Sequence, residues 1–167
     1  LVQSYCQVQG WSELDLHQRL MEQSIAECPD TDEVQAIIDP ARRQYRTLID
    51  RVQGLLLKRI EVEGWPPEGG LRQTQVFDRF VAPALERRDK VAYVLADSLR
   101  FEMGRALAAE LTAVGDVQIL EAAAALPTVT QNGMAALLPG ADGALSLKTV
   151  GNELVPHLGI VPLKDSD

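Results

Sequence analysis

"VAYVLADSLRFEMGRALAAEL" occupies residues 91–111 and decides how the chain is expected to fold. An apolar run from Val91 to Ala96 ends at one carboxylate, Asp97, and a helical pattern follows from about Ser98 to Thr112. Continuous apolar runs of this length are typical of strands that are buried on both faces of a parallel sheet. Because burying an unpaired charge is costly, a carboxylate at the tip of such a strand requires an explanation.

A second strand and a second helix are expected downstream. The stretch "VQILEAAAAL" (117–126) is a strand candidate, and "TQNGMAALLPG" (130–140) is typical of a short helix that ends at Pro139-Gly140. The order strand, helix, strand, helix predicts a βαβ unit, and hence a parallel sheet with a right-handed crossover. Beyond it, "LSLKTVGNELVPHL" (145–158) alternates around Gly151-Asn152, which predicts a tight hairpin.

The first 64 residues have a helical pattern. Ser12 is a plausible N-cap for one helix, Pro29-Asp30 ends it, and Thr31 can cap the next segment. Asp39-Pro40 then indicates a further helix start, with Pro40 at its first position. From there apolar residues step by 4, 3, 4 and 3, as in a short coiled coil, at Ala41, Tyr45, Leu48, Val52 and Leu55. We expect a helical hairpin packed on itself or on a neighbour.

"GWPPEGG" (64–70) is the clearest linker, because its prolines and glycines disfavour both helix and strand. It is followed by "TQVFDRFVAPALERRD" (74–89), a short helix that Pro83 is expected to kink. The sequence therefore predicts three parts: a helical segment over 1–64, a linker over 65–73, and an α/β domain over 74–167.

Composition limits the function classes. The 167 residues carry a net charge of −8, which argues against a nucleic-acid surface of general positive charge without excluding a local basic groove. Cys6 and Cys28 have no metal-ligand spacing and are typical of reduced cytosolic thiols, with a disulfide as a minor alternative. A signal peptide and a run of ~20 apolar residues are both missing, so we expect a cytoplasmic protein with no membrane contact. The ends, Leu1 and "PLKDSD", suggest a fragment of a longer protein.

Two strand tips carry the candidate chemistry. Ligands of open parallel sheets bind beyond the carboxyl ends of the strands, where Asp97 is expected. The second strand ends at "ALPTVTQNG", which offers Thr128 and Thr130 at the start of a helix, a position that favours anions. A carboxylate beside a hydroxyl on one rim suits metal-assisted attack on a phosphorus or sulfur ester.

Simpler roles are also consistent with these residues. Asp97 followed by Ser98 can cap the helix that begins there, and an aspartate at a strand tip also fits a receiver domain, where it would accept phosphate. Thr128 or Thr130 can be an N-cap only. Of the two histidines, His17 is expected on a helix surface or interface, and His157 in the hairpin is expected to be structural.

Two motifs in order resemble the PglZ domain, a branch of the alkaline phosphatase superfamily. That branch shows a strand that ends in Asp, a small residue, a hydrophobic residue and Arg-aromatic-Glu, and here these are residues Asp97 to Glu102. About thirty residues later it shows Leu-Pro-Ser/Thr, one residue and Thr, matched by Leu126 to Thr130, and then Gly-Met-Ala-Ala-Leu-Leu-Pro, matched by Gly133 to Pro139. The second block is also similar to the Pro-Ser/Thr-x-Thr pattern of nucleotide pyrophosphatases/phosphodiesterases.

The resemblance implies both a chemistry and a biological setting. In the related enzymes the residue that matches Thr130 is the nucleophile and a metal ligand, and the residue that matches Asp97 is a metal ligand. Asn132 would help to hold the oxygens of the substrate. PglZ proteins belong to bacterial phage-defence systems of the BREX and Pgl type, so the expected partners are other proteins of such a system. The expected activity is hydrolysis of phosphate esters with divalent metal ions, Zn or Mn/Mg, and a phosphodiester or nucleic acid as a possible substrate.

One departure from the family pattern keeps an alternative open. The two-metal site of the superfamily takes further Asp and His ligands from later in the chain, and after Thr130 this sequence has His157 alone as a histidine. The sequence therefore suggests the first half of a truncated alkaline-phosphatase-like domain that is inactive alone and active when full length. The alternative is a non-catalytic scaffold or protein-interaction module of the defence complex, with helices 1–64 as its docking surface.

Overall fold

A computed structural model describes residues 2–28 and 32–163 of the chain. The chain divides into two units. The helical unit comprises residues up to Trp65 together with Leu99–Ile119, and the strand unit comprises Pro66–Ser98 together with the residues from Leu120 onward. The expected end of the first helix at Pro29-Asp30 and the expected cap at Thr31 lie outside the described residues. The predicted division into 1–64, 65–73 and 74–167 stays a prediction.

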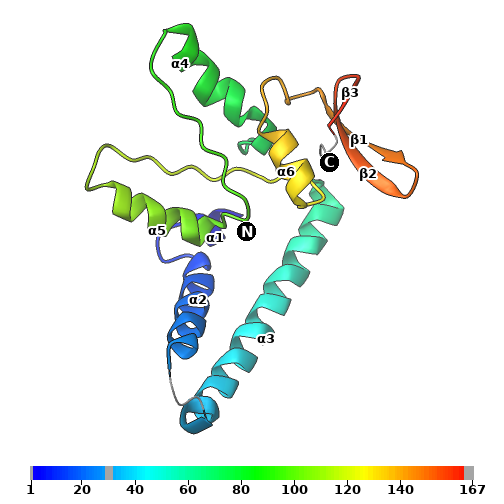
Figure 1. The fold of residues 1–167 in the computed structure, drawn as a ribbon. Helices are drawn as coiled ribbons and strands as arrows, with labels where there is room; N and C mark the ends of the chain where they lie inside the picture. The colour runs from blue at the N-terminus through cyan, green and yellow to red at the C-terminus, as the bar shows by residue number, and fades with distance from the viewer. Residues whose placement is uncertain (1, 29–31, 164–167) are drawn as a thin grey trace. The chain divides into compact units, whose positions relative to one another are not determined.

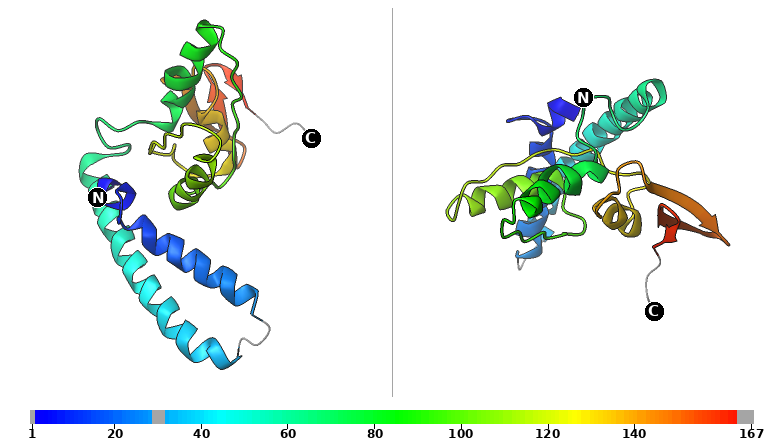
Figure 2. Two further views of the ribbon diagram at one scale, coloured as in Figure 1. Left: turned by 90° about the vertical axis from the view of Figure 1, so that its left-hand side faces the viewer. Right: turned by 90° about the horizontal axis from the view of Figure 1, so that it is seen from above.

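The helical unit contains α1 (Val2–Cys6), α2 (Ser12–Ala26), α3 (Asp32–Glu63) and α5 (Phe101–Leu111). Helices α2 and α3 form the expected hairpin and lie side by side along the first half of α3 (Figure 1; Figure 2). The expected N-cap at Ser12 is wrong by one position. The cap is Trp11, which has a helical backbone and no side-chain cap bond, and Ser12 is the first residue of α2 and is buried.

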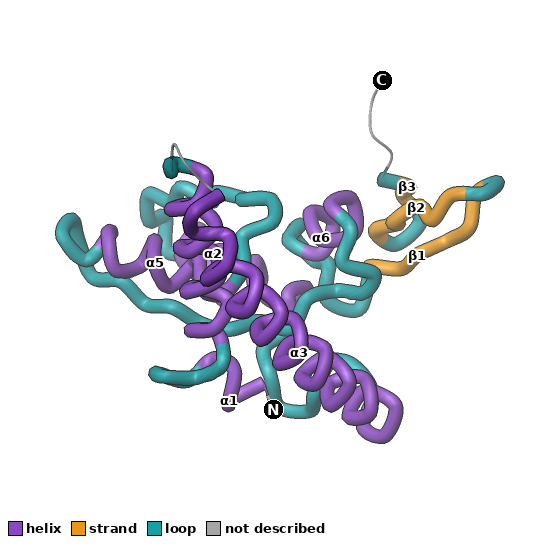
Figure 3. Tube along the Cα trace, turned by 90° about the horizontal axis from the view of Figure 1, so that it is seen from below, coloured by secondary structure: helices purple, strands orange, loops and turns teal. Residues whose placement is uncertain are grey.

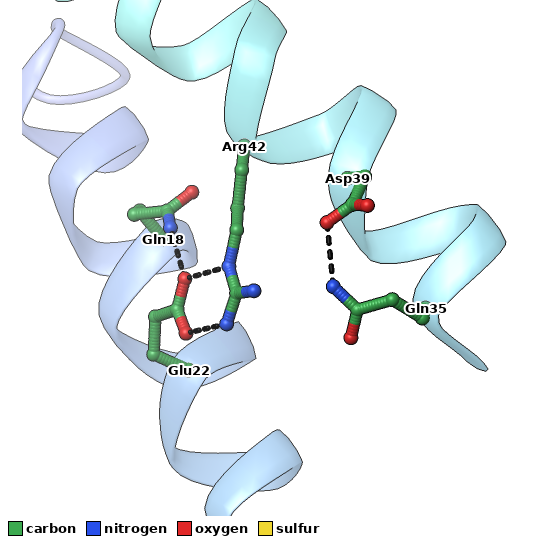
Figure 4. Close-up of polar contacts among 5 residues, drawn as sticks. All are labelled: Gln18, Glu22, Gln35, Asp39 and Arg42. Atoms are coloured by element: carbon green, nitrogen blue, oxygen red, sulfur yellow. Dashed lines mark hydrogen bonds and ion pairs between the residues drawn. The ribbon is translucent and has the colours of Figure 1, made fainter. Parts of the chain in front are cut away.

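The expected helix start at Asp39-Pro40 is also wrong, because α3 continues through Pro40. Proline inside a helix removes one backbone hydrogen bond and is unfavourable by about 3 kcal/mol. Contacts with α2 on the far side of Pro40 stabilise the continuous helix: Arg42 donates two hydrogen bonds to Glu22, at 2.8 and 2.6 Å (Figure 4). On the near side Gln35 donates to Asp39 at 2.6 Å, and Ile38 is buried. Tertiary contacts thus override the local signal.

Asp15 joins three helices. Its carboxylate accepts hydrogen bonds from the hydroxyls of Tyr5 on α1 and Tyr45 on α3, the latter at 2.7 Å. Burial first, and then the bond to Asp15, raises the pKa of Tyr45 to about 12, and the same causes in the same order raise the pKa of Tyr5. Both phenols therefore stay protonated, and able to donate, to a higher pH than an ordinary tyrosine.

Helix α5 is packed on α2. Arg105 donates to Glu13 at 2.8 Å, and the ring of Phe101 lies 6.3 Å from that of Tyr5. Glu102 is only 2% exposed, and its carboxylate lies 4.0 Å from the Nε atom of Arg19, which gives an ion pair without a hydrogen bond. Phe101, Glu102 and Arg105 are thus held by contacts with residues of α1 and α2, which come about 80 to 100 positions earlier in the chain.

The strand unit contains short helices and one small sheet. The helical elements are a 3₁₀ turn at Gln73–Gln75, a π-helical turn at Phe77–Val81, α4 (Ala82–Glu86) and α6 (Thr130–Ala136). Strands β1 (Leu145–Val150), β2 (Glu153–Leu158) and β3 (Val161–Pro162) pair antiparallel in that order (Figure 3). Because Val150 pairs with Glu153, the turn falls at Gly151-Asn152, and the predicted hairpin is confirmed.

The parallel sheet expected from the sequence is not formed within the described residues. Residues 91–96 and 117–122 are extended but belong to no strand, and Ala123 makes an isolated parallel bridge with Arg72. Their apolar side chains are exposed, most of all Val94 at 82%. A buried parallel strand needs strands beside it and helices over both faces, and the described residues do not provide them. The fold is thus a mixture of helices and a three-stranded antiparallel sheet.

Candidate functional site

Asp97 and Thr130, 33 positions apart in sequence, lie in contact in the strand unit. Asp97 follows the extended segment 91–96, and Ser98 after it adopts a positive φ of 57°, which turns the chain sharply. Thr130 is the first residue of α6, after Val129 in an extended conformation. The sequence predicts that the chain changes from one element to the next at Asp97 and at Thr130, and the backbone does turn at both residues.

The Thr130 hydroxyl donates to both carboxylate oxygens of Asp97, with oxygen–oxygen distances of 3.3 and 3.4 Å. These distances exceed the usual 2.5–3.0 Å of O–H···O bonds, so the hydroxyl is shared loosely between the two oxygens. Both side chains are exposed. A carboxylate and a hydroxyl that are in contact and open to solvent can be reached by a substrate. Helix α6 has only seven residues, so the helix-start contribution expected from the sequence is small.

Asn132 faces the interior of the strand unit. Its side chain is 1% exposed, and Nδ2 donates to the carbonyl of Pro127 at 3.0 Å, while Oδ1 has no partner within the described residues. It lines a cavity of about 310 Å³ whose wall also includes Arg72, Asp142 and Ser146. The amide nitrogen is therefore engaged with the backbone that leads to Thr130, and the expected contact of Asn132 with a substrate stays a prediction.

Two residues that sequence reasoning missed organise the chain around Thr130. Gln73, which falls in the predicted linker, donates to the carbonyl of Gly133 at 3.1 Å and accepts from the backbone N–H of Ala125 at 3.0 Å. It thereby holds the segments on either side of Thr130. Asp142 accepts hydrogen bonds from three side chains, those of Arg72, Thr74 and Gln75. The one local signal for Asp142 is its place in "GADG", a turn sequence.

The residues that the structure describes do not complete a metal site. Among them, no group of three or more His, Cys, Asp and Glu side chains is placed to hold an ion. Asp97 and Thr130 supply one carboxylate and one hydroxyl, and divalent cations in proteins take four or more ligands. His157 is 8% exposed, and its Nδ1 atom lies 3.1 Å from the carbonyl of Val155, which is consistent with the structural role expected for it.

Comparison with known families identifies the part of the chain that carries these residues. Residues 76–152 match the family of the BREX system PglZ alkaline phosphatase-like domain, and the match includes Asp97, Thr130 and Asn132. No curated protein and no solved structure matches the chain. Over the matched residues the chain is similar to this PglZ domain, a domain of the BREX system.

In residues 2–28 and 32–163, no helix combines the length and the apolar character needed to cross a membrane.

Proposed function

We propose that the complete PglZ domain hydrolyses phosphate esters within a phage-defence system, with Thr130 as the nucleophile. The observation that supports this proposal is the exposed contact between the Thr130 hydroxyl and the Asp97 carboxylate, inside a segment that matches an alkaline phosphatase-like domain. A free threonine hydroxyl is a weak nucleophile, and a carboxylate in contact with it orients it and can accept its proton. The proposed substrate is a phosphodiester, with a nucleotide or a nucleic acid as its source.

The proposed reaction has two steps. The oxygen of Thr130 attacks phosphorus while its proton passes to Asp97, the bond from phosphorus to the leaving group breaks, and the departing oxygen takes up the proton. The phosphoryl group now bound to Thr130 still carries the second ester group of the phosphodiester. Water attacks this phosphorus, the bond to the Thr130 oxygen breaks, a phosphomonoester is released, and a proton from the water restores the Thr130 hydroxyl. Domains of this superfamily generally use divalent metals, and Zn or Mn/Mg bound next to Asp97 would neutralise charge on the phosphoryl group. The described residues do not fit a complete metal centre, so the metal is not part of the steps written here.

We also propose that the remaining ligands, and the strands that complete a parallel sheet, come from residues outside 1–167. Two observations support this. Segment 91–96 is apolar, segment 117–122 is apolar except for Gln118 and Glu121, and the two expose Val94, Leu95, Ile119 and Leu120 by 40% or more. Such segments gain hydrophobic stabilisation when further strands cover them. On this basis the chain alone would be inactive and the longer protein active.

The test is hydrolysis of a chromogenic phosphodiester by the full-length protein, with Zn²⁺, Mn²⁺ or Mg²⁺ added. Thr130→Ala should lower kcat by roughly a thousandfold or more, because it removes the nucleophile. Thr130→Ser should retain much of the activity. Thr128→Ala is the matched control, because Thr128 is an exposed threonine two positions away, and its loss should change kcat by less than about twofold.

Wild-type rates in a folded Thr130→Ala protein would show that the nucleophile is another residue. A second candidate function, a non-catalytic scaffold of the defence complex, is favoured by the incomplete ligand set among the described residues. A full-length protein that is inert with every metal and substrate would support the scaffold and exclude the hydrolase.

A further inference from the structure

The second half of α3 extends beyond the helix that pairs with its first half. Tyr45 contacts Asp15, and Arg42 contacts Glu22, so α2 and α3 run antiparallel. Helix α2 begins only three residues before Asp15, whereas α3 continues for eighteen residues after Tyr45. The views in Figures 1 and 2 agree that α2 accompanies only part of α3. The C-terminal half of α3 therefore has no α2 residues beside it.

This half of α3 carries a row of exposed apolar side chains at heptad spacing. Leu48, Leu55 and Val62 follow one another at intervals of seven residues and are 40%, 45% and 83% exposed. Residues seven apart lie on nearly the same face of a helix, with a drift of about 20° per heptad. A single exposed leucine is ordinary, but a row at this spacing is the pattern by which one helix packs against another.

Basic residues flank the row with the same spacing. Arg51 and Lys58 are exposed, lie seven positions apart and make no salt bridge within the described residues. Of the six basic residues between 42 and 59, Arg42 and Arg59 are already paired with Glu22 and Glu63. Arg51 and Lys58 are cations beside the row that no salt bridge within the described residues neutralises, and their complement is acidic.

We propose that this α3 face, formed by Leu48, Leu55, Val62, Arg51 and Lys58, binds an acidic amphipathic helix of a partner protein. The heptad row would pack against apolar residues of that helix, and the flanking cations would pair with its carboxylates, as at the edges of coiled coils. A second copy of the chain would bring basic flanks together in an antiparallel pair, and a nucleic acid would neutralise the cations but leave the apolar row uncovered. The proposal is independent of whether Thr130 is catalytic.

The probe is a synthetic helical peptide of about four heptads with Leu at the core positions and Glu at the flanking positions. Its counterpart has Lys in place of Glu. Binding to the full chain is measured by fluorescence anisotropy at physiological ionic strength. We expect the Glu peptide to bind at least about tenfold more tightly than the Lys peptide.

Two pairs of variants locate the binding face. Arg51→Glu with Lys58→Glu should invert the preference between the peptides. Arg43→Glu with Arg46→Glu, an equal charge change at positions about 120° or more around the helix from the leucine row, should leave it unchanged. Leu48→Ser with Leu55→Ser should weaken binding of the Glu peptide by about tenfold or more. Leu57→Ser is the matched control, because Leu57 is 61% exposed and lies on the opposite side of the helix from Leu55.

Several results would overturn the proposal. Equal affinity for the two peptides, or equal losses in the control variants, would show that the α3 face has no such specificity. Displacement of the Glu peptide by a short DNA duplex, together with no effect of the leucine changes, would indicate a polyanion surface. Dimerisation of the chain without peptide, lost in Leu48→Ser with Leu55→Ser, would assign the face to a second copy. Circular dichroism checks that each variant keeps its helices, and the charge variants test the proposal if the serine variants unfold.

Discussion

In the helical unit, side chains of one helix bind side chains of another, whereas around Thr130 in the strand unit side-chain amides bind the backbone. The helical unit uses the ion pairs Arg42–Glu22 and Arg105–Glu13, whose members are 30–40% exposed. Gln73 and Asn132 instead bind carbonyl and N–H groups of the chain around Thr130, and Asn132 is almost fully buried. Partly exposed ion pairs contribute little individually, but a polar group left without its partner in a protein interior is costly. The helical unit should therefore tolerate the loss of single contacts better than the chain around Thr130.

The largest effect is expected at Gln73. Gln73→Ala removes both hydrogen bonds that hold Ala125 and Gly133, and it should lower the free energy of unfolding by about 1–3 kcal/mol. Thr74→Ala is the matched control, because the Thr74 hydroxyl donates to the side chain of Asp142 in an exposed contact of 3.1 Å, and it should cost less than about 1 kcal/mol. Urea unfolding of both variants checks the difference, and hydrogen exchange at the Ala125 N–H locates it. Equal losses would remove the distinction between backbone-holding amides and exposed side-chain contacts.

Substitution of two glycines by alanine should change the stability of the helical unit by an intermediate amount, with a loss at Gly10 and a gain at Gly54. A Cβ atom on Gly10 would lie 2.6–2.7 Å from the carbonyl oxygens of Ser4, Tyr5 and Gln7, so Gly10→Ala should destabilise the helical unit by about 1–2 kcal/mol. Gly54 lies inside α3, and a Cβ there meets nothing within 4 Å. Gly54→Ala should therefore stabilise the unit by about 0.5–1 kcal/mol. Thermal unfolding followed by circular dichroism compares the two variants, and a stable Gly10→Ala protein would contradict the close approach of α1 to the start of α2.

Because of Tyr45, the free energy of unfolding should fall at alkaline pH. The pKa of Tyr45 is raised from 10.0 to about 12. The stabilisation of the folded state that this shift represents is therefore complete below pH 10 and is lost as the pH rises through about 12. Tyr45→Phe removes the bond to Asp15 and should cost no more than about 1 kcal/mol at neutral pH, because the contact is partly exposed. The variant should also lose less stability than the wild type between pH 10 and 12. Urea unfolding at several pH values tests this, and parallel curves for the two proteins would contradict the assignment.

The smallest effect is expected at Glu22. Hydrogen bonds from Arg42 lower the pKa of this carboxyl below its usual 4.5, and a weaker effect of desolvation opposes them. The resulting stabilisation is present above pH 4.5 and is lost as the pH falls through the lower, folded-state pKa. Glu22→Gln should therefore make the α2–α3 pair slightly less stable at neutral pH and less sensitive to acid. An NMR titration of the Glu22 carboxyl measures the shift directly, and a pKa at or above 4.5 would show that the ion pair does not form in solution.

The sequence predicted those elements that are determined by interactions between residues close together in the chain. The hairpin at Gly151-Asn152 follows from turn chemistry and alternation, and both are contained in fourteen residues of sequence. The helical hairpin follows from apolar periodicity. Its uninterrupted passage through Pro40 does not, because the contacts that stabilise it come from Glu22 and Asp15, far away in sequence.

The contact between Asp97 and Thr130 was expected for a reason that the structure does not reproduce. The sequence placed both residues at the tips of adjacent parallel strands, yet neither strand forms in the described chain, and the two residues meet where loops turn. Strand formation depends on partners that a single segment cannot specify. The role of Gln73 was equally hidden, because a glutamine that binds two distant backbone groups leaves no spacing or composition signal.

The exposed apolar segments also have a consequence for handling the protein. The uncharged run "VAYVLA" makes no backbone–backbone hydrogen bond within the described residues and has high β-propensity, and this combination favours intermolecular cross-β pairing and aggregation. The net charge of −8 opposes such association through mutual repulsion, which salt screens. Colloidal solubility of the isolated chain should therefore fall as ionic strength rises, or as the pH approaches the isoelectric point near 4.8.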